Sequence, residues 1–152
     1  MLEKRDFLRV VELTPLVAID LVICSPQRQI LMGKRVNRPA QNFWFVPGGR
    51  IMKEERLEHA FRRISSVELG VACNIEDARL LNGFTHLYDD NFAGVPDIST
   101  HYVVLAYRLD LELDLTRLPA QQHQGYRWID EDEGKATGDI HANSQAYFAY
   151  LR

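Results

Sequence analysis

The sequence predicts a layered α/β domain built on a mixed sheet, and three observations lead to that prediction. The length of 152 residues suits one compact domain with a single core. Apolar residues make up 46% and charged residues 26%, which is ordinary for a soluble globular protein. Strand-like segments lie on both sides of one central amphipathic helix, and this order is typical of α/β layers.

The first half of the chain predicts a helix, a hairpin and the central helix. Residues 3–13 place Phe7, Val10, Val11 and Leu13 on one side of a helix. Residues 16–24 are rich in branched side chains and predict a strand, and residues 30–35 predict the returning strand of a hairpin. A loop and a glycine turn follow. We expect a helix from about Glu54 to Leu69, ended by Gly70, whose core side is Leu57, Ala60, Phe61, Ile64, Val67 and Leu69.

The second half predicts three more strands and a terminal helix. Residues 78–88 and 100–109 are strand-like and are joined by a polar loop. A second polar loop precedes a short strand over residues 126–129. Residues 141–152 form an amphipathic pattern that predicts a C-terminal helix.

Composition also limits the partners and the compartment. No apolar run approaches the ~20 residues that span a bilayer, and the N-terminal segment has the pattern of a helix, not of a signal peptide. Cys24 and Cys73 lack metal-site spacing, so we expect buried free thiols in a cytoplasmic protein. The net charge of −3 argues against nucleic acid as a partner.

The charge is unevenly distributed along the chain. Residues 34–63 contain eight Lys and Arg against three acids, so this segment carries +5 and the rest of the chain −8. A local basic excess on an acidic protein suits a small anionic ligand such as a diphosphate. A solvated helix face explains Arg56 and Arg62, but it explains Arg35 and Arg50 poorly because these two flank a glycine turn.

One stretch, GGRIMKEERLEHAFRRISSVELGV from Gly48 to Val71, has the spacing of a metal-binding motif. It resembles the Nudix box, G-x5-E-x7-R-E-U-x-E-E-x-G-U with U aliphatic, and matches at Gly49, Glu55, Arg63, Glu68, Gly70 and Val71. Ile64 and Val67 stand where the box has glutamates, and Ser65 stands where it has an aliphatic residue. Only acids of the metal-and-base set are lost, and this indicates a changed mechanism.

The resemblance extends beyond the box and becomes more specific. GKRVNRPAQNFWFVPGGR, HLYDDNF, THYVVLAYR, QQHQGYRW and HANSQAYF are together similar to GDP-mannose mannosyl hydrolases, a Nudix subfamily that lacks the same glutamates. The resemblance implies a Nudix fold, which is an α/β/α sandwich. It also implies hydrolysis of GDP-mannose and GDP-glucose to GDP and free sugar, with water attacking the sugar C1 and inverting it.

The same resemblance implies a base and a metal site. His123 matches the family's general base, in a loop from which it would reach the sugar, and histidine titrates near neutral pH. Mg²⁺, or Mn²⁺, would be held by the Gly48 carbonyl, Glu68 and Gln122, all hard oxygen donors. Judged without the family, His123 is a solvated loop histidine, Glu68 an exposed helix acid and Gln122 an ordinary loop amide.

Other matches imply contacts to the substrate. Arg35 and Arg50 match residues that neutralise the departing diphosphate, which suits a planar guanidinium. His86 and Tyr102 match residues near the leaving group and the sugar, although Tyr102 alone is an ordinary strand aromatic. Arg63 either contacts ligand or forms a salt bridge with Glu55.

The remaining matches are less specific. Asp20, an acid among apolar strand residues, lies near the sugar or forms a structural pair. Leu2 and Phe7 match an N-terminal segment that contributes to the guanine site, in a family that forms homodimers, while helix packing is the other explanation of Phe7. Two rival functions stay open: a standard Nudix pyrophosphohydrolase that attacks phosphorus, and a non-catalytic nucleotide-sugar binding module.

Overall fold

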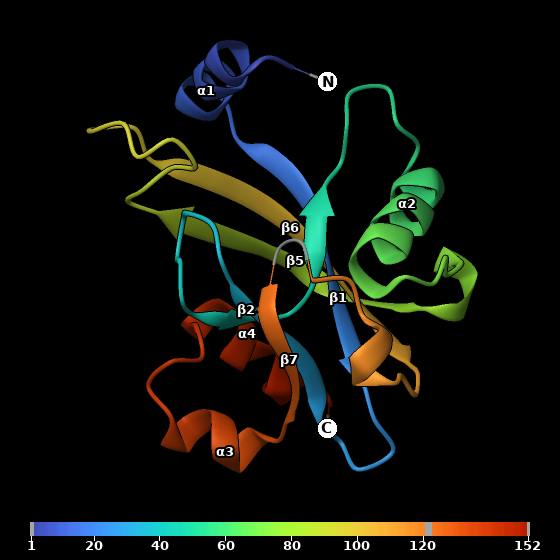
Figure 1. Cartoon of the computed structure of the whole chain (residues 1–152). Helices are drawn as coiled ribbons and strands as arrows, with labels where there is room; N and C mark the ends of the chain where they lie inside the picture. Colours follow the sequence, from blue (N-terminus) through green and yellow to red (C-terminus); the bar gives the residue numbers. More distant parts are fainter. Residues whose placement is uncertain (1, 121–122, 152) are drawn as a thin grey trace.

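The computed structural model describes residues 2–120 and 123–151, and within them seven strands form one mixed sheet (Figure 1). The strands are β1 Leu16–Cys24, β2 Ile30–Arg35, β3 Trp44–Phe45, β4 Gly48–Arg50, β5 Arg79–Tyr88, β6 Thr100–Asp110 and β7 His123–Ile129. The main path runs β3-β2-β1-β6-β5, while β4 pairs with β1 and β7 pairs with β2. β1 and β6 are parallel and the other pairs are antiparallel, so the predicted mixed sheet is confirmed.

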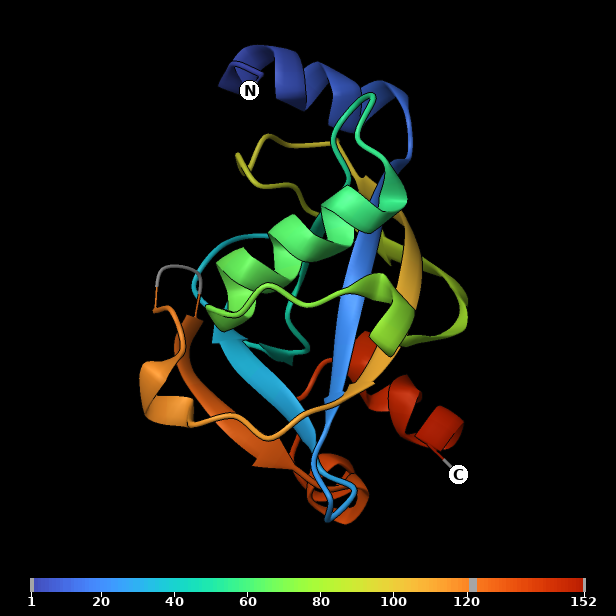
Figure 2. The ribbon, with the colours of Figure 1, turned by 90° about the vertical axis from the view of Figure 1, so that its right-hand side faces the viewer.

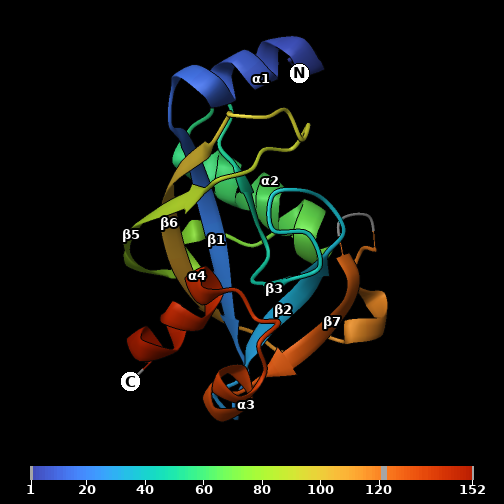
Figure 3. The same cartoon turned by 90° about the vertical axis from the view of Figure 1, so that its left-hand side faces the viewer.

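Helices cover both faces of the sheet. The α-helices are α1 Lys4–Leu13, α2 Leu57–Leu69, α3 Glu131–Ala136 and α4 Ala142–Gln145, and the 3-10 turns are η1 Ile75–Asp77, η2 Leu115–Arg117 and η3 Ala146–Leu151. α2 lies across one face (Figure 2), and α4 with η3 lies on the other (Figure 3). α1 lies at one end of the sheet. The expected α/β/α arrangement is therefore confirmed.

β1 forms the centre of the core because both of its faces are buried. Ile19, Leu21 and Ile23 point toward α2 and pack with Phe61 and other apolar side chains of that layer. Val22 and Cys24 point the other way, into a cluster that includes residues of η3. A strand covered on both faces reads as a continuous apolar run, and this is the pattern of residues 16–24.

The helix boundaries differ from the sequence predictions at two places. α2 begins at Leu57 and not at Glu54, because the backbone of Glu54 has φ +66°, outside the right-handed helical region. Gly70 ends the helix in the left-handed conformation, as predicted. The C-terminal helix is a single turn, α4, that continues as the tighter η3 and so buries Tyr147.

Three smaller expectations are wrong. Val67 is 49% exposed, so it does not face the core as expected. β7 begins at His123, three residues before the predicted strand, because its first residues pair with the end of β2. Both cysteines are free, although only Cys24 is buried. Among the described helices, none combines the length and the apolar character that a membrane crossing needs.

Candidate active site

A cleft of about 330 Å³ lies between α2 and the sheet, and it contains most of the site residues that the sequence predicts. Asp20, Arg35, Gly48, Arg50, Arg63, Glu68, His86, Tyr102 and His123 all line it. These residues come from α2 and from strands that are far apart in the sequence. The fold therefore brings acidic, basic and imidazole side chains from α2 and from the sheet to one cleft.

Two predicted residues, Phe7 and Leu2, lie outside this cleft. Phe7 lines a second cleft of about 550 Å³, which shares Arg35 and Tyr102 with the first. Leu2 is 46% exposed and lines neither cleft. Gln122 lies outside the residues that the structure describes.

His123 is buried and not solvated as an isolated loop histidine would be. It pairs with Arg35 across the β2–β7 ladder, next to a register shift, and only 6% of it is exposed. Its ring lies on Gly33, where a Cβ atom would come within 2.5 Å of the imidazole Cγ and Nδ1. Glycine at position 33 is thus what allows the ring to lie flat on the strand.

The two ring nitrogens of His123 have different surroundings. Nε2 lies 3.8 Å from Oε2 of Glu68, which is too long for a hydrogen bond but close enough for an ion pair when the ring is protonated. Nδ1 is buried and has no hydrogen-bond partner among the described residues. The Nε2 edge therefore faces the acid of the box helix.

Glu68 is the acid of α2 that faces the cleft, and it is 5% exposed. In the described part of the chain its side chain makes one polar contact, the ion pair with His123. The described residues contain no group of three His, Cys, Asp or Glu that would hold a metal ion alone. Glu68 and the backbone of Gly48 are hard donors on the same cleft, and they suit a cation such as Mg²⁺ only if a ligand adds oxygens.

The two box positions that lack their glutamates both line the cleft. Ile64 is 1% exposed and packs on Gly49, where an added Cβ would lie 3.1 Å from its Cγ1. Val67 is largely exposed at the cleft surface, next to Glu68. Acids at these positions would have faced the same space as Glu68, and apolar side chains occupy it instead.

The retained pair Glu55 and Arg63 is a salt bridge. Nε of Arg63 donates to Oε2 of Glu55 at 2.7 Å and Nη2 donates to Oε1 at 2.9 Å, and the Arg63 guanidinium lowers the pKa of Glu55. Arg63 Nη2 also donates to the backbone oxygen of Arg50 at 2.7 Å. Of the two explanations for Arg63, the geometry shows the salt bridge, and the same contacts fix the backbone beside the glycine turn.

Asp20 is held by a residue that the sequence did not single out. The hydroxyl of Tyr147, in η3, donates to Oδ2 of Asp20 at 2.6 Å. Burial raises the pKa of Asp20 to about 7, while the Tyr147 hydrogen bond and the charge of Arg35 lower it. Gly48 allows this arrangement, because a Cβ there would lie 2.6 Å from Oδ1 of Asp20.

The remaining wall is formed by paired residues of β5 and β6. His86 lies opposite Tyr102 in the antiparallel ladder, and both line the cleft. Burial lowers the pKa of His86 to about 4, with a smaller contribution from His141, so the ring is neutral at pH 7. Burial raises the pKa of the Tyr102 hydroxyl, and the nearby Arg35 and Arg50 oppose that shift.

The arginines are supported by aromatic rings. The guanidinium of Arg35 lies 5.3 Å from the ring centroid of Phe45, and that of Arg50 lies 4.5 Å from the centroid of Phe7. These distances are within the range of cation–π contacts. Phe7 therefore supports Arg50, and its ring also contacts that of Phe92.

Comparisons with known proteins agree with this geometry. A model of the NUDIX domain matches residues 14–150. The chain is 40% identical over 110 residues to the Low-salt glycan biosynthesis protein Agl8 of Haloferax volcanii, a match that spans 72% of this chain and 68% of that protein.

Solved structures agree on the fold. A MutT NUDIX hydrolase from Burkholderia pseudomallei superposes with a TM-score of 0.70 at 22% identity, covering 91% of this chain and 99% of that one. The NUDIX domain of Shewanella oneidensis NrtR, in complex with ADP ribose, superposes with a TM-score of 0.67 at 16% identity, covering 99% of this chain and 97% of that one. With its box helix, mixed sheet and cleft, the chain belongs to the Nudix family.

Proposed function

We propose that this Nudix hydrolase cleaves nucleoside diphosphate sugars at the bond between the sugar C1 and the diphosphate. Its proposed substrates are GDP-mannose and GDP-glucose. One observation carries the proposal. The box positions of Ile64 and Val67 line the cleft but hold no acid, while the sheet opposite presents an imidazole and two arginines. Attack on phosphorus usually depends on the lost acids to gather metals and activate water. Attack on carbon needs a base and a stabilised leaving group.

His123 is the general base of this proposal. Its Nε2 edge faces Glu68 across the cleft, so a water held there has both an acceptor for its proton and a nearby carboxylate. As the water oxygen bonds to C1, the C1–O bond breaks and its electron pair stays on the diphosphate. The proton passes to Nε2, the sugar leaves with inverted configuration, and GDP is the other product.

The diphosphate needs positive charge as it departs. Arg35 and Arg50 line the cleft, and guanidinium groups match phosphate oxygens in shape and charge. Mg²⁺ or Mn²⁺, when bound by Glu68, the Gly48 carbonyl and Gln122, would screen the charge on the diphosphate. A leaving group stabilised in this way departs without a protonated carboxyl group beside it.

Other residues would bind the sugar and the guanine of the substrate. Asp20, Tyr102 and His86 line the part of the cleft beside Arg35, and we assign them to the sugar and the leaving group. Arg63 assists by fixing Arg50. Phe7 and Leu2, in the N-terminal segment, would contact guanine in a homodimer.

Support for a sugar nucleotide comes from two sides. The relative from Haloferax volcanii is named for glycan biosynthesis. The cleft is lined by cations and by polar groups, as a charged and hydroxyl-rich substrate requires. The free thiols fit the cytoplasmic location that we propose.

Hydrolysis of GDP-mannose in ¹⁸O-labelled water with Mg²⁺ tests the proposal directly. We expect the label in mannose and unlabelled GDP, both measured by mass spectrometry. Label in a phosphate group, with GMP and mannose phosphate as products, would assign the standard Nudix route. Binding of GDP-mannose without turnover would assign a binding module.

A further inference from the structure

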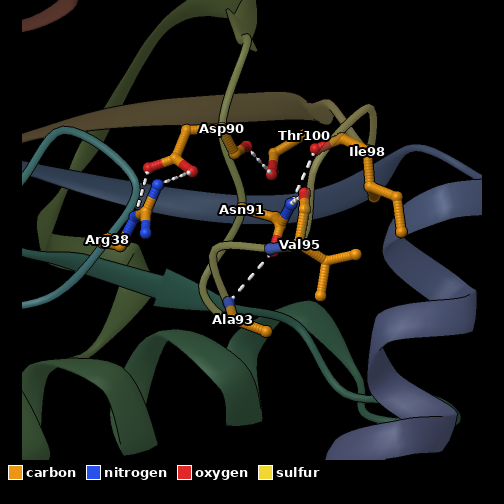
Figure 4. Close-up of polar contacts among 7 residues, drawn as sticks. All are labelled: Arg38, Asp90, Asn91, Ala93, Val95, Ile98 and Thr100. Carbon is orange, nitrogen blue, oxygen red and sulfur yellow. Dashed lines mark hydrogen bonds and ion pairs between the residues drawn. The ribbon is translucent and has the colours of Figure 1, made fainter.

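The loop that joins β5 to β6, residues 89–99, is organised around one buried side chain. Asn91 is 0% exposed. Its Nδ2 donates to the backbone oxygens of Val95 and Ile98, both at 2.8 Å. Its Oδ1 accepts from the backbone nitrogens of Ala93 at 3.0 Å and Val95 at 3.2 Å. As Figure 4 shows, the amide sits inside the loop and ties its two sides together.

Further contacts of Asp90 hold the two ends of this loop together and bind it to Arg38 of a neighbouring loop. The hydroxyl of Thr100 donates to the backbone oxygen of Asp90 at 2.7 Å. The guanidinium of Arg38 binds both carboxylate oxygens of Asp90, at 2.8 and 2.7 Å (Figure 4). Gly94 adopts φ +66°, and a Cβ there would collide with the Arg38 guanidinium. The loop therefore has a fixed position beside the second cleft.

Phe92 links the ordered loop to the first cleft through its contact with Phe7. It is the residue after Asn91, and its ring centroid lies 4.9 Å from that of Phe7. The other contact of Phe7 is with Arg50, whose guanidinium lies 4.5 Å from its ring centroid. Phe92 and Phe7 both line the second cleft, whereas Arg50 lines the first. Asn91, Phe92, Phe7 and Arg50 thus form a continuous series of contacts.

Arg50 depends on that series for its side-chain position. Within residues 2–120 and 123–151, its guanidinium makes no salt bridge and no hydrogen bond. Arg63 holds the Arg50 backbone, but that contact leaves the long side chain free to rotate. A guanidinium that is already in place loses less conformational entropy when it binds an anion.

We propose that Asn91 is a positioning residue for Arg50: by ordering residues 89–99 it holds Phe92 against Phe7, and Phe7 carries the Arg50 guanidinium into the active-site cleft. The placement of Arg50 does not rest on the proposed function, although its use on a departing diphosphate does. Asn91 itself is buried inside its loop and lines neither cleft.

The placement is tested by NMR of the arginine Nε–Hε groups. A proton above the face of Phe7 is shifted to lower frequency by the ring current, and Arg50→Lys identifies the signal by its loss. We expect Asn91→Ala to return the Arg50 signal to the ordinary arginine range. We expect the same shift of the Arg50 signal in Phe92→Leu, which keeps the buried amide of Asn91. If Asn91→Ala does not fold, the Phe92→Leu variant tests whether the contact with Phe92 positions Arg50. Arg108→Gln, which breaks an exposed ion pair with Asp110 in β6, is the control and leaves the signal in place.

The use of Arg50 is tested by calorimetric titration with GDP and Mg²⁺. We expect Asn91→Ala and Arg50→Lys each to weaken GDP binding about tenfold, and the double variant to be little weaker than either, since both changes act through one group. Additive losses, or an Arg50 signal that stays shifted in the Phe92→Leu variant, would overturn the inference. If the wild-type chain leaves GDP-mannose intact, the proposed function fails while the NMR result still decides the placement.

Discussion

The two walls of the cleft differ in kind, although both belong to one small domain. The α2 wall presents Ile64, Val67 and a single acid, Glu68. The sheet wall presents Asp20 and His123 together with Arg35 and Arg50. In the usual box pattern the helix supplies most of the acids of the site. In this chain two of those acids are replaced by Ile64 and Val67, and most of the titratable groups that line the cleft lie on strands.

The retained part of the box serves a different purpose from the lost part. Glu55 and Arg63 satisfy each other, and Arg63 also holds the backbone of Arg50. Gly70 ends the helix in the left-handed region. These positions maintain the turn and the helix. The chain has kept the residues that build the box and has replaced two that would have filled its cleft with charge.

His123→Gln should have the largest effect, because it removes the proposed general base from the sheet wall. Glutamine keeps a polar side chain of similar reach but cannot accept the proton from water. We expect kcat for GDP-mannose to fall by ~10²–10⁴, as is usual for the loss of a general base. The dissociation constant for GDP with Mg²⁺ should change little. Steady-state kinetics and calorimetry measure the two quantities.

The matched control for that prediction is His59→Gln. His59 is an exposed histidine on α2 and does not line the cleft, so its loss should leave kcat unchanged. A near-normal kcat in His123→Gln would remove His123 from the base role. A large loss of GDP affinity would instead make it a binding residue.

Val67→Glu tests whether a second acid on the α2 wall strengthens metal binding. Val67 is exposed on the cleft beside Glu68, so a carboxylate there needs no buried space and adds a second negative charge to the wall. We expect Mn²⁺, titrated in the absence of nucleotide, to bind about tenfold more tightly, which corresponds to ~1.4 kcal/mol. Calorimetry or the electron paramagnetic resonance signal of free Mn²⁺ measures the change.

Val71→Glu is the matched control. Val71 is 47% exposed, close to the value for Val67, but it lies beyond the end of α2 and outside the cleft. The same charge placed there should leave Mn²⁺ affinity as it is. Equal gains from both substitutions would mean that general acidity, and not the α2 wall, determines the affinity.

Much of the fold could be predicted because its elements have clear local patterns. The branched run of residues 16–24 predicts β1 correctly, and the 3.6-residue periodicity before Gly70 predicts α2. Failures occur where tertiary contacts override the pattern. His123 joins a strand because the end of β2 offers it a partner, and Val67 is exposed because the cleft opens beside it. Neither partner strand nor cleft is visible in a local window.

The site could be predicted only in part for the same reason. Box spacing leads to Glu68, Arg63 and the glycine turn, since those residues are close in sequence. Nothing near Asp20 in the sequence indicates Tyr147, which lies in η3 at the other end of the chain. The support of Arg50 by Phe7 and Phe92 also joins three distant segments. Such contacts depend on how the strands pair, and sequence periodicity does not determine that.

His86 offers the smallest test, and it concerns the stability of the sheet wall. Burial lowers the pKa of His86 to about 4, below the ordinary histidine value of 6.5. Between these values the unfolded chain binds a proton that the folded chain does not, so folding stability falls as pH falls through this window. We expect His86 to account for about 1 kcal/mol of lost stability between pH 6.5 and pH 5.5. Denaturant unfolding at the two pH values measures it.

The contribution of His86 is isolated by comparing two glutamine variants. Between pH 6.5 and pH 5.5, His86→Gln should lose about 1 kcal/mol less stability than the wild-type chain, because glutamine does not titrate. His59→Gln removes an exposed histidine from α2 and should retain the full dependence. Burial also lowers the pKa of His141 and raises the pKa of Asp20 to about 7, so these two groups still contribute, in opposite directions, in His86→Gln. An unchanged dependence there would show that water or a neighbouring acceptor relieves the burial of His86.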